Sequence, residues 1–142
     1  MTTPLRELLN SWRNASFSER EKGERFERLI QAYLLEDDKY NFEDVWLWKE
    51  WAELKGEDGR DTGIDLVALD KETGVYWAIQ CKFYAEDAKI YKRHIDSFFT
   101  QSGKAPFGQR LIVLTTASLS EHVESAQQGQ QIPCINLTLD DL

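Results

Sequence analysis

The sequence has few of the residues that build zinc sites and disulfide frameworks, and it has no long apolar run. It holds two cysteines, Cys81 and Cys134, and two histidines, His94 and His122, among 142 residues. Their separations match no zinc-ligand spacing, and two distant cysteines make no disulfide framework. No apolar run approaches the roughly 20 residues of a membrane-spanning helix. We therefore expect a cytoplasmic protein with no membrane partner, whose cysteines are buried free thiols.

Positive charge is also scarce, and it is unevenly placed. The formal net charge is −8 and the sequence pI is about 4.8, which argues against a polybasic nucleic-acid binder. Residues 23–72 hold fifteen acidic and seven basic side chains, and residues 111–142 hold four acidic side chains and no basic one. Residues 83–110 carry a net charge of +2. An enzyme that acts on nucleic acid through a bound cation remains open.

The spacing of the apolar residues predicts one domain of alternating helices and strands. Helices are predicted over residues 4–13, 18–35, 87–102 and 118–128, and strands over 43–50, 64–69, 75–82, 111–115 and 132–139. Ser18 is the expected N-cap of the second helix, with Glu21 as its capping-box partner. This order predicts an α/β domain of mixed α+β type, in which helices flank a central mixed β-sheet.

Polar side chains cluster on one face of the hairpin predicted over residues 64–82. Because strand side chains alternate between faces, Gln80 and Lys82 share a face, and pairing Asp70 with Val75 places Asp65 opposite Gln80. Asp65 would supply a hard oxygen for Mg²⁺, with the Gln80 side-chain carbonyl and the Cys81 backbone carbonyl as further ligands. Lys82 would hold or deprotonate a water molecule. The alternative is an ordinary cross-strand ion pair between Asp65 and Lys82.

Two further carboxylates have a functional and a structural interpretation each. Glu27 shares its angular position on the second helix with Leu34, so it can face a cleft between helix and sheet. Alternatively, its side chain extends into solvent or pairs with Arg28 or Lys39. Asp61 can bind a second cation, or it can cap the glycine-rich loop through an Asx-turn, which we favour.

A group of basic residues follows the hairpin. Its members proposed to contact DNA phosphates are Lys89, Lys92, Arg93 and Lys104. The first three fall on one helical face at i, i+3 and i+4, but an ordinary solvated face explains that spacing equally well. Tryptophans of the chain can stack on bases, although core packing is the commoner role of this residue type.

Three short motifs in this order resemble the Mrr-like branch of the PD-(D/E)xK nucleases. They are Gly23-Glu24-Arg25-Phe26-Glu27, Asp61-Thr62-Gly63-Ile64-Asp65-Leu66 and Gln80-Cys81-Lys82. The resemblance covers residues 20–138, and the run over residues 59–68 is most similar to the N-terminal nuclease domain of single-chain Type ISP restriction–modification enzymes. It implies the restriction-endonuclease-like fold. We expect a helical extension over residues 1–19 and the nuclease domain over residues 20–142, as part of a longer chain.

The resemblance also implies roles for individual residues. Asp65 would be the principal metal ligand, Lys82 the catalytic lysine and Glu27 the helix carboxylate of the active site. Gln80 stands where many relatives carry an acid, so the site has one negative charge fewer and a weaker expected affinity for Mg²⁺. Ile64 replaces the proline that commonly precedes the key aspartate.

The sequence therefore predicts an endonuclease domain that hydrolyses phosphodiester bonds of double-stranded DNA with Mg²⁺, or with Mn²⁺ as a substitute. Its expected partners in the same longer chain are helicase or translocase, methyltransferase and target-recognition domains. One alternative is a nuclease of the Holliday-junction resolvase type. Another is a catalytically silent docking domain with the same fold. A small-molecule enzyme is less favoured, because no cofactor motif is present.

Overall fold

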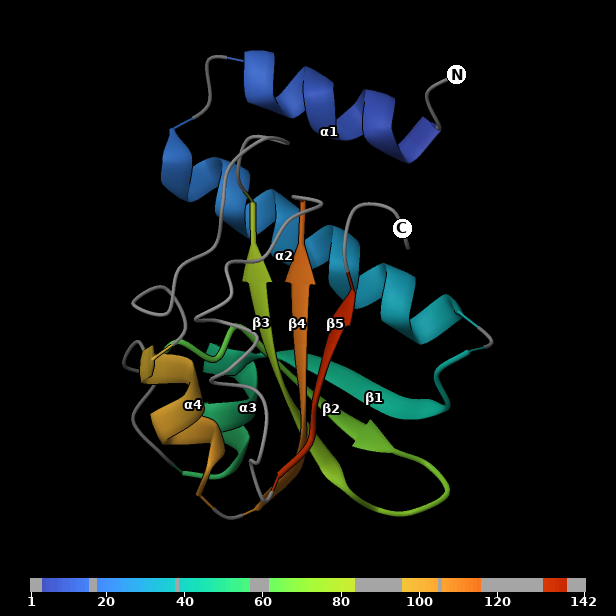
Figure 1. The fold of residues 1–142 in the computed structure, drawn as a ribbon, viewed down its shortest axis with the longest axis vertical. Helices are drawn as coiled ribbons and strands as arrows, with labels where there is room; N and C mark the ends of the chain where they lie inside the picture. The colour runs from blue at the N-terminus through green and yellow to red at the C-terminus, as the bar shows by residue number, and fades with distance from the viewer. Residues whose placement is uncertain are drawn as a thin grey trace.

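A five-stranded sheet with helices on both faces forms the centre of the computed structural model (Figure 1). The structure describes residues 4–15, 18–37, 39–56, 62–83, 96–104, 106–115 and 132–137. Helices α1 (Pro4–Asn14) and α2 (Glu19–Glu36) contribute to the core on one face. Helices α3 (Trp48–Leu54) and α4 (Asp96–Ser102) contribute to the core on the other face.

The strands follow the order β1-β2-β3-β4-β5 across the sheet. They are β1 (Phe42–Leu47), β2 (Leu66–Asp70), β3 (Tyr76–Lys82), β4 (Phe107–Leu114) and β5 (Cys134–Leu137). The pairs β1–β2 and β2–β3 are antiparallel, whereas β3–β4 and β4–β5 are parallel. The predicted mixed sheet flanked by helices is therefore confirmed.

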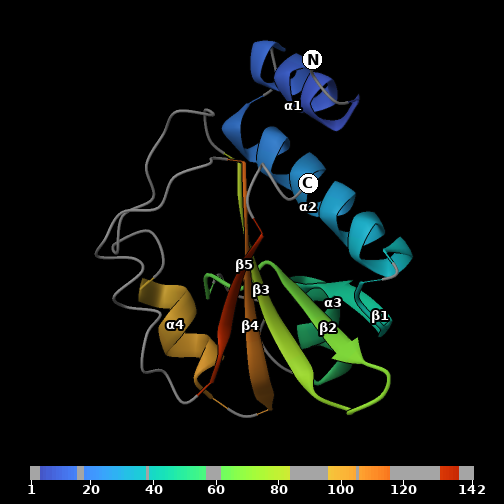
Figure 2. The same ribbon diagram turned by 45° about the vertical axis from the view of Figure 1, so that its right-hand side comes forward.

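Helix α2 lies across the sheet and forms one wall of the site described below (Figure 2). Its N-terminus is capped as predicted, since Ser18 Oγ accepts the Glu21 N–H at 3.1 Å. Phe26, Ile30 and Leu34 are buried at helical spacing against the sheet. Gln31 Nε2 donates to the carbonyl of Val45 at 2.8 Å. Apolar burial and this bond hold α2 against β1.

The interpretation of residues 43–50 as one strand is wrong at its second half. Strand β1 ends at Leu47, and residues from Trp48 onward form helix α3. Trp51 and Ala52 are buried on one side of this helix, and Glu50 Oε1 accepts the Leu47 N–H at 3.1 Å at its start. Burial of one helical face outweighed the preference of tryptophan for strands.

The other described elements have the predicted type, and only their boundaries differ from the prediction. Strand β4 begins at Phe107, four residues before the predicted strand, because only its second half is continuously apolar. The predicted helix over 118–128 and the first part of the helix predicted over 87–102 lie outside the described residues. Leu9 of α1 is buried in the same core as Phe26 of α2. The division of the chain at residue 19 stays a prediction.

Candidate active site

The β2–β3 hairpin has the register that its turn predicts. The Asp70 N–H donates to the Val75 carbonyl at 2.9 Å, and Leu66 pairs with Ile79. The Asp65 N–H donates to the Ile79 carbonyl at 2.8 Å just before β2 begins. Continued by one residue, this register would place Asp65 opposite Gln80, but Asp65 is not among the paired residues of β2, so that placement stays a prediction.

The two faces of β3 carry different side chains. Ile79 and Cys81 pack in the core beneath α2, whereas Ala78 packs in the core shared with α3 and α4. Alternation then places Gln80 and Lys82 on the side of Ala78. Gln80 is 2% exposed and its Nε2 donates to the Gly63 carbonyl at 3.2 Å, while Lys82 is half-buried. The alternation of Ala78, Ile79 and Cys81 agrees with a common face for Gln80 and Lys82, which stays a prediction.

Asp65 is held at the end of the hairpin by a bond to the main chain. Its Oδ2 accepts the backbone N–H of Cys81 at 2.7 Å. Hydrogen bonds to an ionised carboxylate are short and strong, so this one fixes the orientation of the Asp65 side chain. It also ties Asp65 to the residue between Gln80 and Lys82.

Asp65 and Glu27 face the same cleft between α2 and the start of α3. The cleft encloses about 600 Å³ and is lined by Arg20, Gly23, Glu24, Glu27, Arg28, Leu47, Trp48, Lys49, Ile64 and Asp65. Glu27 is half-buried, at the margin of the apolar face of α2. Glu27 therefore lines a cleft together with Asp65, and its role in an active site stays a prediction.

The pKa of the Cys81 thiol is shifted by burial and by nearby charged groups. Burial raises the pKa of Cys81 well above its usual range, and the negative charges of Asp65 and Glu27 raise the pKa further. The positive charge of Lys82 lowers that pKa. The pKa of Cys81 therefore responds to the charges of Asp65, Glu27 and Lys82 as well as to burial.

Comparisons with known proteins identify the family of the chain. A family model named Mrr_cat_2 and described as a restriction endonuclease matches residues 36–142. The chain belongs to this restriction endonuclease family. The match begins at the last residue of α2, so Glu27 lies outside the matched residues. No curated protein matches the chain.

Two solved structures resemble this family member. One is an ATP-dependent Type ISP restriction-modification enzyme, LlaBIII, bound to DNA, with 27% identity and a TM-score of 0.70. The similarity covers 94% of this chain and 8% of that one, so the chain spans a small part of that enzyme's length. The other is a repair endonuclease from Pyrococcus abyssi, with 15% identity and a TM-score of 0.43 over 88% of this chain and 49% of that one. The first likeness identifies the fold as restriction-endonuclease-like.

Among the predicted site residues in the described part of the chain, only Glu27 and Asp65 line the cleft, and Gln80, Cys81 and Lys82 do not. Asp61, Lys89, Lys92 and Arg93 lie outside the described residues. Lys104 is exposed beyond α4, where its Nζ donates to Gln101 Oε1 at 3.4 Å, and it is not among the residues that line the cleft. The DNA-binding roles of these four basic residues stay predictions.

Sequence reasoning missed several residues that line the cleft. Arg20, Glu24 and Arg28 recur every four residues on α2 beside Glu27, a spacing that could have placed them on one face. Trp48 and Lys49 carried no such signal, because their segment was interpreted as a strand. In the described ranges, no group of three or more histidine, cysteine or acidic residues forms a metal site.

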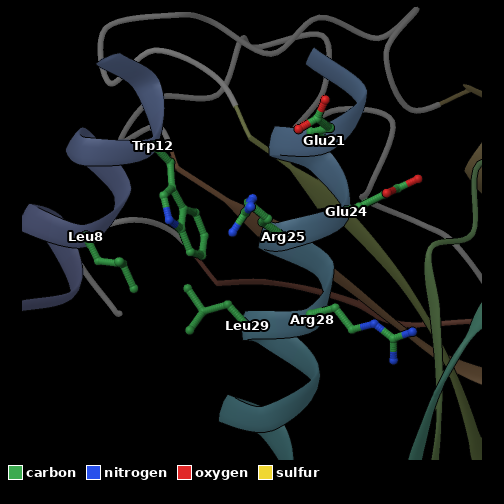
Figure 3. A pocket seen from close by; sticks show the side chains of 7 residues that line it. All are labelled: Leu8, Trp12, Glu21, Glu24, Arg25, Arg28 and Leu29. Atoms are coloured by element: carbon green, nitrogen blue, oxygen red, sulfur yellow. The ribbon is translucent and has the colours of Figure 1, made fainter. Parts of the chain in front are cut away.

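A second groove lies between α1 and α2 and holds none of the predicted site residues. It encloses about 610 Å³ and is lined by Leu8, Trp12, Glu21, Glu24, Arg25, Arg28 and Leu29. Figure 3 shows Leu8 and Trp12 on α1 opposite Arg25 and Leu29 on α2. It shares Glu24 and Arg28 with the cleft, but Asp65 does not line it.

Gly63 connects the site to α4. Its φ is +85°, and a Cβ there would meet the Phe98 backbone nitrogen at 2.9 Å. Only glycine adopts this conformation readily and permits so close a contact. Because the Gly63 carbonyl accepts the Gln80 amide, the position of α4 bears on the orientation of Gln80.

Proposed function

We propose that this chain is the metal-dependent DNA endonuclease module of a larger restriction enzyme. Membership of the restriction endonuclease family supports the nuclease class. The observation that carries the proposal is that Asp65 and Glu27 line one cleft, and that Asp65 Oδ2 accepts the N–H of Cys81, the residue between Gln80 and Lys82. Carboxylates that face a cleft, beside a lysine, are groups suited to the hydrolysis of a phosphodiester bond.

The donor atoms at this position suit a hard divalent cation. The Asp65 carboxylate, the Gln80 side-chain carbonyl and the Cys81 backbone carbonyl would hold Mg²⁺, with Mn²⁺ as a substitute, because both cations prefer oxygen ligands. The cation would polarise a phosphoryl oxygen and lower the pKa of a bound water. Gln80 is neutral, so the site carries less negative charge and we expect a weaker affinity for the cation.

The chain's own residues would then carry out the remaining steps. Lys82 would hold the attacking water through its ammonium group and balance charge that develops on the phosphate. Glu27, across the cleft from Asp65, would accept a hydrogen bond from that water and direct it at phosphorus in line with the leaving oxygen. The bond from the Cys81 N–H keeps Asp65 in one orientation throughout.

The larger context is proposed from the similarity to a DNA-bound Type ISP enzyme, of which this chain spans 8%. Double-stranded DNA would be the substrate. Helicase or translocase, methyltransferase and target-recognition domains would belong to the same longer protein and would act with it in the cytoplasm. In the described segments no helix is long and apolar enough to cross a membrane.

Cleavage of supercoiled plasmid tests the proposal. We expect the intact protein to cleave in Mg²⁺ and not in EDTA. Removal of transition-state contacts by Asp65→Ala or Lys82→Ala is expected to reduce the cleavage rate at least about 100-fold. Lys71→Ala, an exposed change in the β2–β3 turn, serves as the control. Undiminished cleavage by both site variants would refute the assignment.

A catalytically silent docking domain is the second candidate, because no trio of acidic, histidine or cysteine ligands forms in the described residues. Calorimetry with Mg²⁺ or Mn²⁺ separates the two functions. A nuclease site gives binding that depends on Asp65. A docking domain gives no such binding.

A further inference from the structure

Gly23 lies in the wall of the cleft, and protein packing does not explain why a glycine stands there. It is within α2, an 18-residue helix, and it is not among the glycines with positive φ. A Cβ at Gly23 would meet no atom of the described residues within 4 Å. Gly63 contrasts with it, because a Cβ there would overlap the backbone of Phe98.

The position of Gly23 relates it to the proposed chemistry. It precedes Glu27 by one helical turn, and both residues line the cleft that contains Asp65. A glycine leaves the helix backbone bare, so a bulky group can approach it closely. The wall formed by α2 therefore carries no side chain at Gly23, one helical turn before Glu27.

Cations stand on both walls of the same cleft. Arg28 comes from α2 and Lys49 from α3. Both side chains are exposed, and Arg28 makes a long bond of 3.5 Å to Gln31 Oε1. Arg20 also lines the cleft, but its Nε lies 3.2 Å from Glu24 Oε1. Arg28 and Lys49 are thus the better placed to meet an anion.

We propose that the Gly23 face of α2, together with Arg28 and Lys49, is a contact surface for the sugar–phosphate backbone of the cleaved DNA strand. Gly23 gives the backbone room to approach α2 beside Glu27, and the two cations bind phosphates that flank the cleaved one. This inference rests on the proposed nuclease function and adds the surface that positions its substrate.

Substitution of Gly23 separates this role from a structural one. Gly23→Ala raises the helix propensity of α2 and fits the open space, so it should raise the Tm by about 3 °C. The added methyl group should displace the DNA backbone and lower kcat/KM about 10-fold, and Gly23→Leu about 100-fold. Ala32→Leu adds bulk at an exposed position of α2 away from the cleft and should leave cleavage unchanged.

The salt dependence of DNA binding in EDTA tests the two cations. Lys49→Gln and Arg28→Gln should each reduce the slope of log K against log salt concentration by about 1. Lys71→Gln should leave the slope unchanged. The contact surface is refuted if Gly23→Leu cleaves like wild type, or if Lys49→Gln and Arg28→Gln keep the wild-type slope. If the contact surface is refuted but Asp65→Asn is inactive, the proposed nuclease function still stands. If Asp65→Asn cleaves like wild type, the nuclease function itself is refuted.

Discussion

Asp65 and Cys81 show how one backbone contact arranges a charged site. The Cys81 N–H donates to Asp65 Oδ2 at 2.7 Å, so the carboxylate is held against the backbone of β3. Burial, then Asp65, then Glu27 keep the thiol of Cys81 protonated by raising its pKa. The thiol is therefore a neutral packing group, and its residue can serve the site only through its backbone.

The raised thiol pKa predicts a loss of stability in alkaline solution. Both Cys81 and Cys134 have raised values in the folded chain, and burial raises the pKa of Cys134 to about 11. In the unfolded chain a thiol ionises near pH 8.5, so stability should fall as the pH rises above about 8.5 and towards each folded value.

Thermal unfolding at pH 7.5 and pH 10 checks this effect. We expect each single change, Cys81→Ala or Cys134→Ala, to reduce the drop in Tm between the two pH values. An unchanged drop in both variants would show that the thiols do not cause it.

At the scale of the element, the loop before β2 depends on α4. Gly63 combines a φ of +85° with a Cβ position 2.9 Å from the Phe98 backbone nitrogen. Its carbonyl also accepts the amide of Gln80. Two contacts therefore hold the loop before Asp65 in this conformation. They are the close approach of Gly63 to α4 and the hydrogen bond from Gln80 of β3.

Gly63→Ala is expected to lower the free energy of unfolding by about 1–3 kcal/mol, through backbone strain and the overlap with Phe98. Cleavage should fall as well, because Gln80 loses its anchor. Gly74→Ala is the matched control, since its φ is +72° but no described atom lies within 4 Å of its Cβ position. Denaturant unfolding of both variants measures the difference. Equal losses in the two variants would show that the contact with α4 adds nothing.

The sequence predicted the elements whose pattern is local. The register of β2 against β3 followed from a short turn, and the Ser18 N-cap followed from capping chemistry. Helix α3 was missed because its seven residues are rich in tryptophan, which favours strands in isolation. Lys49 entered the site only through the packing of α3 near α2, which no local pattern encodes.

At the scale of the whole molecule, the net charge of −8 works against contact with DNA. The residues that line the cleft carry no net formal charge, because three of them are basic and three are acidic. The basic ones are Arg20, Arg28 and Lys49, and the acidic ones are Glu24, Glu27 and Asp65. The carboxylates lie where a cation would offset them, and Arg28 and Lys49 lie where phosphates would pass. An acidic chain can therefore present a neutral cleft to a polyanion.

The most direct measurement is plasmid cleavage in Mg²⁺ by Asp65→Asn beside Asp44→Asn. The two variants make the same chemical change, one in the cleft and one on the exposed face of edge strand β1. We expect Asp65→Asn to lose at least about 100-fold in cleavage rate while it keeps the wild-type Tm within a few degrees, and Asp44→Asn to cleave like wild type. Wild-type cleavage by Asp65→Asn would contradict the assignment of Asp65 to the metal-dependent hydrolysis of DNA.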